Sequence, residues 1–320
     1  MSLLEAHLSS RLGYRARVRE RRRAGQGLSD ETLVLRVEGP DGQREQLVVR
    51  VRRPSGLLRS EGDPRAHYEL LRALEHSAVP VPRARWYEAD ESVLGGPFFV
   101  MDAVPGSVPV PWSPEGRAFL ARAGEGPIGD AFPAVLAAIH AVEDAPARPA
   151  PGLDWLAGLV EEHRSGPEPI LTDALFWLRE HVPAPVEAVL VHGDYRTGNL
   201  IYDGDRIAAV LDWEFACLGD PAIDLAWVCA ASNRMGSELV CQLLPRERFL
   251  ARYAVASGRV TDEARLHFWE LFHQVRHAAI WLSSTAAYAA GRTRDLRLAR
   301  MAYALPTMRR LVANLLEGYA

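Results

Sequence analysis

The 320 residues of this chain are 48% hydrophobic, which is enough to fill the core of one large domain or of two lobes. A formal net charge of −4 gives no reason to expect nucleic-acid binding, and no stretch approaches the roughly 20 apolar residues of a membrane-spanning helix. The cysteines Cys217, Cys229 and Cys241 fit neither a disulfide framework nor a zinc site, so we expect free thiols and a cytoplasmic protein without a membrane partner. The oligomeric state is not written in the sequence.

The first hundred residues predict a small antiparallel sheet with one helix. After a short amphipathic helix over residues 1–14, the run "RARVRERRR" is typical of a solvated edge strand. "ETLVLRVEG" and "EQLVVRVRR" form a predicted hairpin around "GPDGQR". A helix begins at Pro64, with Asp63 as its N-cap, and "RARWYEAD" and "PFFVMDAV" are further strands.

The composition shifts near residue 104, where Pro and Gly become frequent as far as about Pro133, and this stretch predicts a linker and a loose loop. Helical periodicity then follows over 131–143, 152–163, 173–182 and 264–290. We therefore predict an α+β fold of two lobes. An N-terminal lobe covers 1–104, a mainly helical C-terminal lobe covers 105–320, and a hinge lies at about 98–106.

One stretch, "VHGDYRTGNLIYDGDRIAAVLDWE" (Val191 to Glu214), carries most of the chemistry. "NLIY" and "IAAVLD" are β-like, and the Asp-Gly pair between them is a strong hairpin signal. The hairpin would bring Asn199 and Asp212 together at its open end. An amide oxygen and a carboxylate there would suit Mg²⁺, which also takes phosphate oxygens. Asp194, in the loop just before, would supply a carboxylate beside this pair.

His192-Gly193-Asp194, Asn199 and the later Asp212 resemble the catalytic loop and metal-binding aspartate of protein kinases. The Gly of "HGD", the "LDWE" run and "FACLGDPAIDLAW" are similar to the aminoglycoside phosphotransferase and choline kinase superfamily. "GGPFFVMDAVPG" is similar to the hinge of its branch that is fused to acyl-CoA dehydrogenases in animals. The resemblance runs from about Gly25 to the last helices. It implies a protein-kinase-like fold and ATP- and Mg²⁺-dependent phosphoryl transfer to a small-molecule hydroxyl.

The resemblance also implies roles for the residues of this stretch. Asp194 would orient the acceptor hydroxyl and accept its proton, and Asn199 and Asp212 would hold Mg²⁺ on the phosphates. Arg196 would stabilise charge on the transferring group, with a surface salt bridge as the alternative. His192 would fix the loop by hydrogen bonds.

Two further carboxylates, Asp220 and Asp224, resemble residues that pin the catalytic loop through local hydrogen bonds. Asp220 also stands at a predicted helix start, where an Asp at the N-cap needs no other reason.

On the nucleotide side, "AGQGLSDET" lies between two predicted strands. Gly25, Gly27 and Ser29 would allow the backbone to approach phosphates closely, although an ordinary hairpin turn explains them as well. The backbone of Met101, Asp102 and Ala103 would meet the adenine edge. The alternative there is a strand whose Met fills the core.

The lysine that kinases carry on the third strand is missing, because the chain contains no lysine. Arg50 and Arg52 share one face of "LVVRVRR", and we expect Arg50 to contact the phosphates, with Arg52 as the alternative. The helix position that pairs with this residue in the family holds His67. Glu69 lies about 200° further round the helix, so either it is recruited by a shift or the ion pair is absent.

The acceptor cannot be read from the sequence, and two other functions remain open. One is a nucleotide-binding pseudokinase, which the His67 position favours, and the other is a metal-dependent hydrolase, which would want more His or Glu ligands. The acceptor pocket should be built by the helical lobe, where a core role is the alternative for most of the aromatics. The candidates are Trp155, Glu214, Trp227, Phe268, Trp269, His273 and Trp281.

Overall fold

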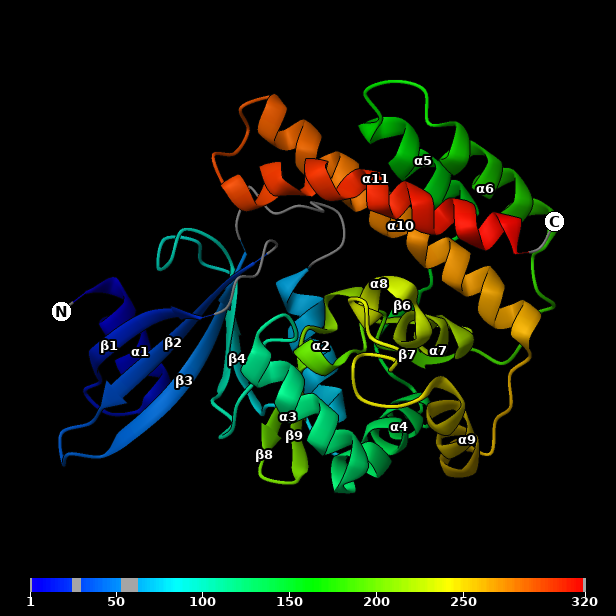
Figure 1. Cartoon of the computed structure of the whole chain (residues 1–320). Coiled ribbons are helices and arrows are strands. Elements are labelled where there is room, and N and C mark those ends of the chain that lie inside the picture. The colour runs from blue at the N-terminus through cyan, green and yellow to red at the C-terminus, as the bar shows by residue number, and fades with distance from the viewer. Residues whose placement is uncertain (1, 25–29, 53–62, 319–320) are drawn as a thin grey trace.

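The computed structural model describes residues 2–24, 30–52 and 63–318, so the predicted phosphate-loop residues Gly25, Gly27 and Ser29 lie outside it. Figure 1 shows a sheet-bearing lobe beside a larger lobe of helices. The mixed α+β architecture agrees with the prediction from the sequence, while the exact division of the chain near residue 104 stays a prediction.

The sheet of the smaller lobe has five strands in the order β1-β2-β3-β5-β4, and every neighbouring pair is antiparallel. The strands are β1 (Arg17–Ala24), β2 (Glu31–Glu38), β3 (Arg44–Val51), β4 (Ala84–Glu88) and β5 (Phe98–Asp102). The arginine-rich β1 is an exposed edge strand, as predicted, and β2 with β3 is the predicted hairpin. An edge lined with charge discourages pairing with another sheet.

The two faces of this sheet serve different purposes because side chains alternate along each strand. On β3, Leu47, Val49 and Val51 pack into a core closed by helix α1 (Leu3–Leu12). Arg50 points to the opposite face, toward helix α2 (Pro64–Leu74). Helix α2 is capped as predicted, since the side chain of Asp63 accepts a hydrogen bond from the backbone N–H of Arg65 at 2.9 Å.

The predicted loose loop between residues 104 and 133 was wrong, because two helices form there. They are α3 (Pro114–Glu125) and α4 (Pro127–His140), and each begins with a proline, which is favourable in the first helical turn. Two glycines of α3 do not form turns but allow the helix to pack closely against neighbouring backbone. A Cβ on Gly116 would come within 2.0 Å of the Val110 carbonyl oxygen. One on Gly124 would come within 1.9 Å of the Leu243 oxygen.

The larger lobe adds seven more helices among the described residues, and those predicted over 152–163, 173–182 and 264–290 are confirmed to within a few residues. These helices are α5 (Leu153–His163), α6 (Pro169–Glu180), α7 (Ala222–Cys229), α8 (Ala231–Arg234), α9 (Arg246–Ser257), α10 (Glu263–Ala289) and α11 (Leu296–Glu317). Helices α5, α6, α10 and α11 share one core, with α10 and α11 side by side in Figure 1. A second core joins α4 and α9 to α2, so it ties the two lobes together.

Short strands position the stretch from Val191 to Glu214. Strands β6 (Arg148–Pro149), β10 (Cys217–Gly219) and β7 (Val189–Val191) form a three-stranded sheet in that order. Between β7 and β10 the chain forms the predicted hairpin of β8 (Leu200–Asp203) and β9 (Arg206–Val210), with the 3₁₀ turns η1 (Thr197–Asn199) and η2 (Trp213–Phe215) on either side. The stretch from Val191 to Glu214 is therefore held at both ends by the pairing of β7 with β10.

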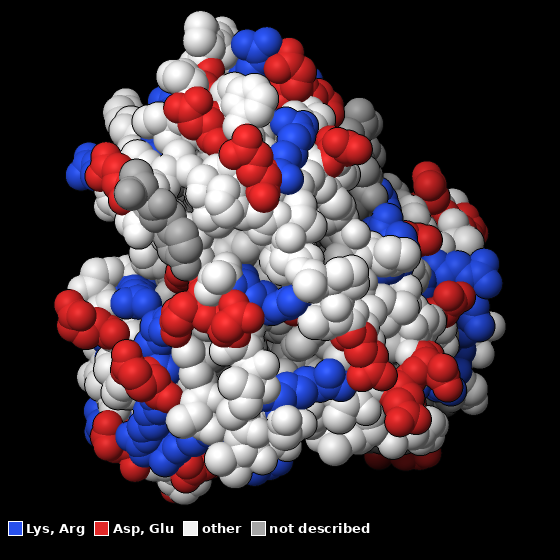
Figure 2. Space-filling model, turned by 90° about the vertical axis from the view of Figure 1, so that its right-hand side faces the viewer, with Lys and Arg blue, Asp and Glu red and all other residues white. Residues whose placement is uncertain are grey.

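No helix in the described parts of the chain is long and apolar enough to cross a membrane. Cys217, Cys229 and Cys241 are buried free thiols, as the sequence predicted. On the face shown in Figure 2, acidic and basic side chains are interspersed, and neither sign dominates.

Candidate active site

The loop that follows β7 is fixed by a buried carboxylate. Asp224 of α7 accepts hydrogen bonds from the backbone N–H groups of His192, at 2.7 Å, and Gly193, at 2.8 Å. The imidazole of His140 donates to the same carboxylate at 3.1 Å. Burial alone would raise the pKa of Asp224, but the hydrogen bonds from His140 and the backbone hold it below its usual value. The predicted pinning role of Asp224 is confirmed.

His192 links this loop to the strand that leads to Asp212. Its Nε2 donates to the carbonyl oxygen of Leu211 at 2.8 Å, and its Nδ1 accepts from the backbone N–H of Asp194 at 3.2 Å. Both nitrogens are thus used for structure, in agreement with the predicted supporting role of His192.

The backbone between His192 and Asp194 requires a glycine at position 193. Its φ is +79°, and a Cβ would lie 2.5 Å from the carbonyl oxygen of Phe215. Its own carbonyl oxygen accepts a hydrogen bond from the guanidinium of Arg276, on α10, at 2.9 Å. A larger residue would push the loop away from both contacts.

We predict that Gly193→Ala lowers the free energy of unfolding by about 2 kcal/mol or more, because a left-handed L-residue costs about 1–2 kcal/mol before any clash. Chemical denaturation measures this loss. Gly204→Ala is the matched control, since Gly204 also has a positive φ, +57°, but no atom lies within 4 Å of its would-be Cβ. Equal losses in the two variants would show that the close approach to Phe215 contributes nothing.

The carboxylate of Asp194 is oriented by three donors. Trp227 Nε1 donates to Oδ1 at 2.8 Å, Arg196 Nε to Oδ1 at 3.2 Å, and Asn199 Nδ2 to Oδ2 at 2.7 Å. All three partners are donors, and between them they engage both carboxylate oxygens of Asp194. The structure therefore brings the predicted residues Asp194, Arg196 and Asn199 into direct contact.

Asp212 lies at the open end of the hairpin, as predicted. The backbone N–H of Leu211 donates to the carbonyl oxygen of Asn199 at 2.8 Å, which places the two residues on neighbouring chain segments. Asp212 has a φ of +59°, a left-handed conformation that Asp tolerates better than most residues. This conformation turns its carboxylate away from the hairpin and toward the smaller lobe.

The partner that meets Asp212 from the smaller lobe is Arg50. Its Nη1 donates to Asp212 Oδ1 at 2.9 Å, and its Nη2 lies 3.4 Å from Glu214 Oε2. Burial alone would raise the pKa of Asp212, but the charges of Arg50 and Arg196 outweigh it and hold the pKa below its usual value. Arg50 thus bridges the two lobes through a pair of carboxylates.

The position expected to hold a helix glutamate is filled by a neutral histidine. Burial, together with the nearby charge of Arg50, lowers the pKa of His67 to about 3. The ring of His67 packs edge-on against Phe99 at 4.9 Å. Glu69 binds Arg65 at 2.9 Å on the exposed side of α2, so it is not recruited to Arg50. The carboxylates that Arg50 binds come from the larger lobe instead.

The predicted hinge residues continue β5. Met101 is buried in the core shared by both lobes, as the alternative interpretation proposed. The backbone N–H of Asp102 donates to the Arg83 oxygen at 2.9 Å, and that of Ala103 to the Gln46 oxygen at 3.2 Å. These two N–H groups already have partners within the smaller lobe.

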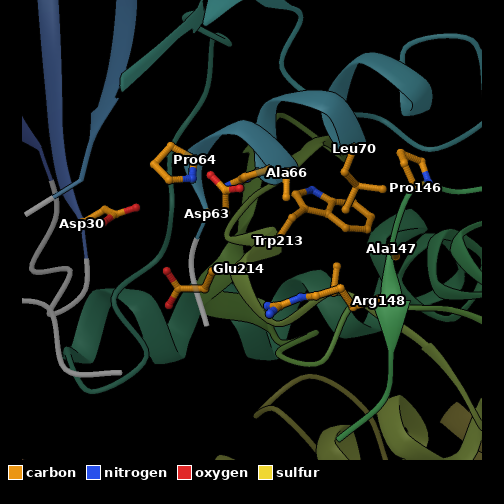
Figure 3. Close-up of a pocket in the computed structure, with 12 residues that line it drawn as sticks. Asp30, Asp63, Pro64, Ala66, Leu70, Pro146, Ala147, Arg148, Trp213 and Glu214 are labelled. Carbon is orange, nitrogen blue, oxygen red and sulfur yellow. The ribbon is translucent and has the colours of Figure 1, made fainter. Parts of the chain in front are cut away.

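A solvent-open pocket lies beside the Arg50 bridge (Figure 3). Asp63, Pro64 and His67 line it from α2, while Trp213 and Glu214 line it from η2. In Figure 3 the carboxylates of Asp63 and Glu214 lie on facing sides of the open space. The pocket therefore follows the junction of the two lobes.

The residues proposed for the acceptor pocket have different surroundings. Trp227, on α7, donates to Asp194. Trp281, on α10, has its ring 5.0 Å from that of His277, and like Trp155 and Phe268 it packs in the core of the C-terminal helices. Two more have structural partners: His273 donates to the Ile223 oxygen at 2.8 Å, and Trp269 donates to Asp220 at 3.0 Å.

Asp220 does not bind the catalytic loop in the described structure. It accepts from the backbone N–H of Ala222 at 2.9 Å at the start of α7, and it pairs with Arg265 of α10. Its expected role in pinning the loop is therefore corrected: the side chain of Asp220 supports the start of α7, although the N-cap residue itself is Pro221 and not Asp220.

A family model described as "Phosphotransferase enzyme family" matches residues 20–269, which is most of the chain and includes Arg50 and the stretch from Val191 to Glu214. The chain belongs to this family. It is therefore a phosphotransferase-family enzyme, and the geometry around Asp194, Asn199 and Asp212 belongs to the matched region.

Among curated relatives, this phosphotransferase is 28% identical over 300 residues to the probable acyl-CoA dehydrogenase IBR3 of Arabidopsis thaliana, a match that covers 80% of the chain and 35% of that protein. It is 33% identical over 218 residues to acyl-CoA dehydrogenase family member 10 of Mus musculus, covering 64% of the chain and 20% of that protein. The chain thus spans about a third or less of the length of these relatives.

Among solved structures, a candidate aminoglycoside phosphotransferase of Ralstonia eutropha JMP134 superposes with a TM-score of 0.76 at 22% identity, covering 99% of this chain and 98% of the other. A thermostable mutant of aminoglycoside phosphotransferase APH(4)-Ia, in a ternary complex with AMP-PNP and hygromycin B, gives a TM-score of 0.60 at 16% identity, with 98% of both chains covered. At these identities the likeness shows the fold, which is the two-lobe protein-kinase-like fold.

Reasoning from the sequence of this phosphotransferase missed two residues at the site. Arg276 donates to Gly193, and its guanidinium lies over the rings of Phe215, at 5.1 Å, and Trp227, at 5.6 Å. His277 follows it and faces Trp227. Only His277 leaves a trace in the sequence: His273, His277 and Trp281 recur every four residues, which places them on one face of α10. No sequence pattern singles out Arg276.

Proposed function

We propose that this phosphotransferase moves the γ-phosphoryl group of ATP, with Mg²⁺, to a hydroxyl group of a small molecule. The observation that carries the proposal is the contact between Asp194 and Asn199, with Asp212 on the neighbouring segment. Phosphoryl transfer needs a positioned hydroxyl and neutralised phosphates more than it needs covalent help. These three residues offer both functions within one loop and hairpin.

Asp194 would orient the acceptor hydroxyl and take its proton. Its carboxylate is held by Trp227 and Asn199, so little freedom remains for it to rotate away from the acceptor. Arg196, whose guanidinium also contacts Asp194, would stabilise the negative charge of the transferring group.

The residues present fit a magnesium ion. Asn199 uses its amide N–H₂ for Asp194, which leaves its side-chain oxygen without a bonded partner among the described residues. Asp212 adds a carboxylate, and Glu214 adds another within reach of the same guanidinium. Hard oxygen ligands of this kind suit Mg²⁺, which would neutralise charge on the phosphates when bound.

The nucleotide would lie between the lobes. The backbone of Met101, Asp102 and Ala103 remains our proposed contact for adenine. The N–H groups of Asp102 and Ala103 are engaged in the smaller lobe, so carbonyl oxygens are the groups these residues could offer. Gly25, Gly27 and Ser29 remain the proposed backbone contacts for the phosphates.

Arg50 is proposed to contact the phosphates in place of the lysine of protein kinases. Arg50→Met should then raise the KM for ATP by about 10- to 100-fold, as expected for losing a charged hydrogen-bonding group. Arg50→Lys should be impaired less, because it keeps the charge but loses the planar fork. Steady-state kinetics at equal folded fractions measure both.

Arg52→Met is the matched control for Arg50, because both side chains leave the same face of the strand region. A larger rise in the ATP KM for Arg52→Met than for Arg50→Met would assign the contact to Arg52. If neither variant changes the KM, the phosphates are held without this strand.

The charges around Asp194 favour a neutral or anionic acceptor over a polycationic one. Arg196 touches its carboxylate, and Arg276 lies over the ring of Trp227, which also touches it. Two guanidinium groups beside one carboxylate would repel a polycation such as an aminoglycoside. Hydroxy acids and their thioesters fit this environment better.

The test of the function is transfer of the labelled γ-phosphoryl group of ATP to a panel of hydroxylated compounds. The panel holds hygromycin B, a macrolide, choline, glucose, 3-hydroxybutyrate and 3-hydroxybutyryl-CoA. We expect Mg²⁺-dependent transfer to at least one compound, with the anionic members preferred. Nucleotide binding without any transfer would favour a pseudokinase, and acceptor-independent phosphate release would favour a hydrolase.

A further inference from the structure

His277 is a polar residue of α10 whose ring nitrogens have no bonded partner among the described residues. It is half-buried on α10, and its Nδ1 is buried without a hydrogen-bond partner among the described residues. No described residue bonds its Nε2 either. Buried polar side-chain atoms are nearly always hydrogen-bonded, so each exception calls for a reason.

His277 lies next to the residue that positions Asp194. Its ring is 5.7 Å from that of Trp227, whose indole N–H donates to Asp194 Oδ1 at 2.8 Å. On its other side, the ring of Trp281 stands nearly perpendicular to it at a centroid distance of 5.0 Å. A half-buried imidazole therefore stands between two indoles, one of which is fixed to the predicted base.

The neighbouring histidine on the same helix face offers a comparison. The Nδ1 of His273 is also buried without a partner among the described residues, but His273 is fully buried and donates from Nε2 to the carbonyl oxygen of Ile223 at 2.8 Å. His277, four residues later, is more exposed and has no such bond. Its polar atoms are thus not part of the packing of α10 against α7.

The imidazole of His277 is neutral at ordinary pH. Burial, together with the charge of Arg276, lowers the pKa of His277 to about 4. The charged groups acting on it are Arg276, Arg196 and Asp194. A neutral imidazole carries one donor and one acceptor, so it can recognise an uncharged or anionic polar group.

We propose that His277 binds the phosphoryl acceptor: its imidazole hydrogen-bonds a polar group close to the hydroxyl that Asp194 orients, while Trp281 packs against the adjoining part of the acceptor. The inference rests on the proposed phosphotransferase function. It adds a specificity residue on α10, which the catalytic motif does not contain.

The test compares His277→Ala and His277→Gln with wild type, using the best acceptor found in the panel of hydroxylated compounds. We expect His277→Ala to raise the KM for that acceptor by roughly 3- to 10-fold, the factor for one hydrogen bond. His277→Gln, which keeps a donor and an acceptor, should recover part of the loss. The KM for ATP should stay within twofold in both variants.

His181→Gln is the control for a histidine away from the site, because His181 is exposed, caps the C-terminal end of α6 and stacks on Trp177. Melting temperatures are measured for every variant. An unchanged acceptor KM in His277→Ala would overturn the inference and leave the proposed function standing. Loss of folding in both His277 variants would make His277 structural, which also overturns it.

Two further outcomes separate this inference from the function on which it rests. If wild type phosphorylates no compound of the panel, the proposed function fails, and the role of His277 falls with it. If the KM values for acceptor and ATP rise together, His277 acts on the whole site, and the specific contact with the acceptor is refuted.

Discussion

Replacing Asp194 with Asn is expected to reduce phosphoryl transfer by about 10²–10⁴-fold, the loss typical of a positioned general base. Trp227 and Asn199 each donate a hydrogen bond to one oxygen of the Asp194 carboxylate. In Asp194→Asn, an N–H₂ group replaces one of these oxygens, so it faces a donor and that hydrogen bond is lost. The side chain keeps its size, and nucleotide binding should change little. Transfer rates measured beside ATP affinity by calorimetry separate the two effects.

Asp205→Asn is a suitable control for Asp194→Asn. Asp205 is exposed in the turn between β8 and β9, only a few residues away in sequence, and the same chemical change there touches no part of the site. If Asp194→Asn turned over within about twofold of the Asp205→Asn variant, Asp194 would have no place in the mechanism.

Asp212→Asn is expected to abolish the dependence of ATP affinity on Mg²⁺. The change removes a charged metal ligand but keeps a residue type that tolerates the φ of +59° found here. Asp212→Ala should show the same loss with added backbone strain, since alanine at a left-handed φ costs about 1–2 kcal/mol. Calorimetric titration of ATP at a series of Mg²⁺ concentrations measures the effect.

The same titration decides between the two carboxylates near Arg50. Glu214→Gln should weaken the Mg²⁺ response only partly if Asp212 is the principal ligand, and Asp205→Asn again serves as the control. A wild-type Mg²⁺ response in Asp212→Asn would show that the metal does not bind at the open end of the hairpin.

The catalytic loop could be predicted from the sequence because its parts are close along the chain. Asp194, Asn199 and Asp212 are joined by one loop and one hairpin, and the Asp-Gly turn fixes how the hairpin closes. The β3 face was predictable for a similar reason, since strict alternation separates Arg50 from the apolar Val49 and Val51.

Contacts between distant segments could not be predicted. Arg50 and Asp212 are 162 positions apart, and nothing in either segment shows that the guanidinium binds this carboxylate. The stretch before residue 133 was wrongly predicted as a loop because it is rich in glycine and proline. Its glycines allow α3 to pack closely against other backbone, and its prolines stand at the starts of helices. The glycine and proline content of a segment does not show whether these residues form turns or pack inside helices.

The Arg50 bridge also determines which chemical reagents could label the proposed nucleotide site. Acylating nucleotide analogues attach to a nucleophilic amine beside the phosphates, and this chain has no lysine anywhere. Burial alone would lower the pKa of Arg50, but Asp212 and Glu214 keep it above its usual value, so the guanidinium stays protonated and a poor nucleophile. Amine-directed labelling would therefore pass over this site in a cell extract even when it is fully occupied by ATP.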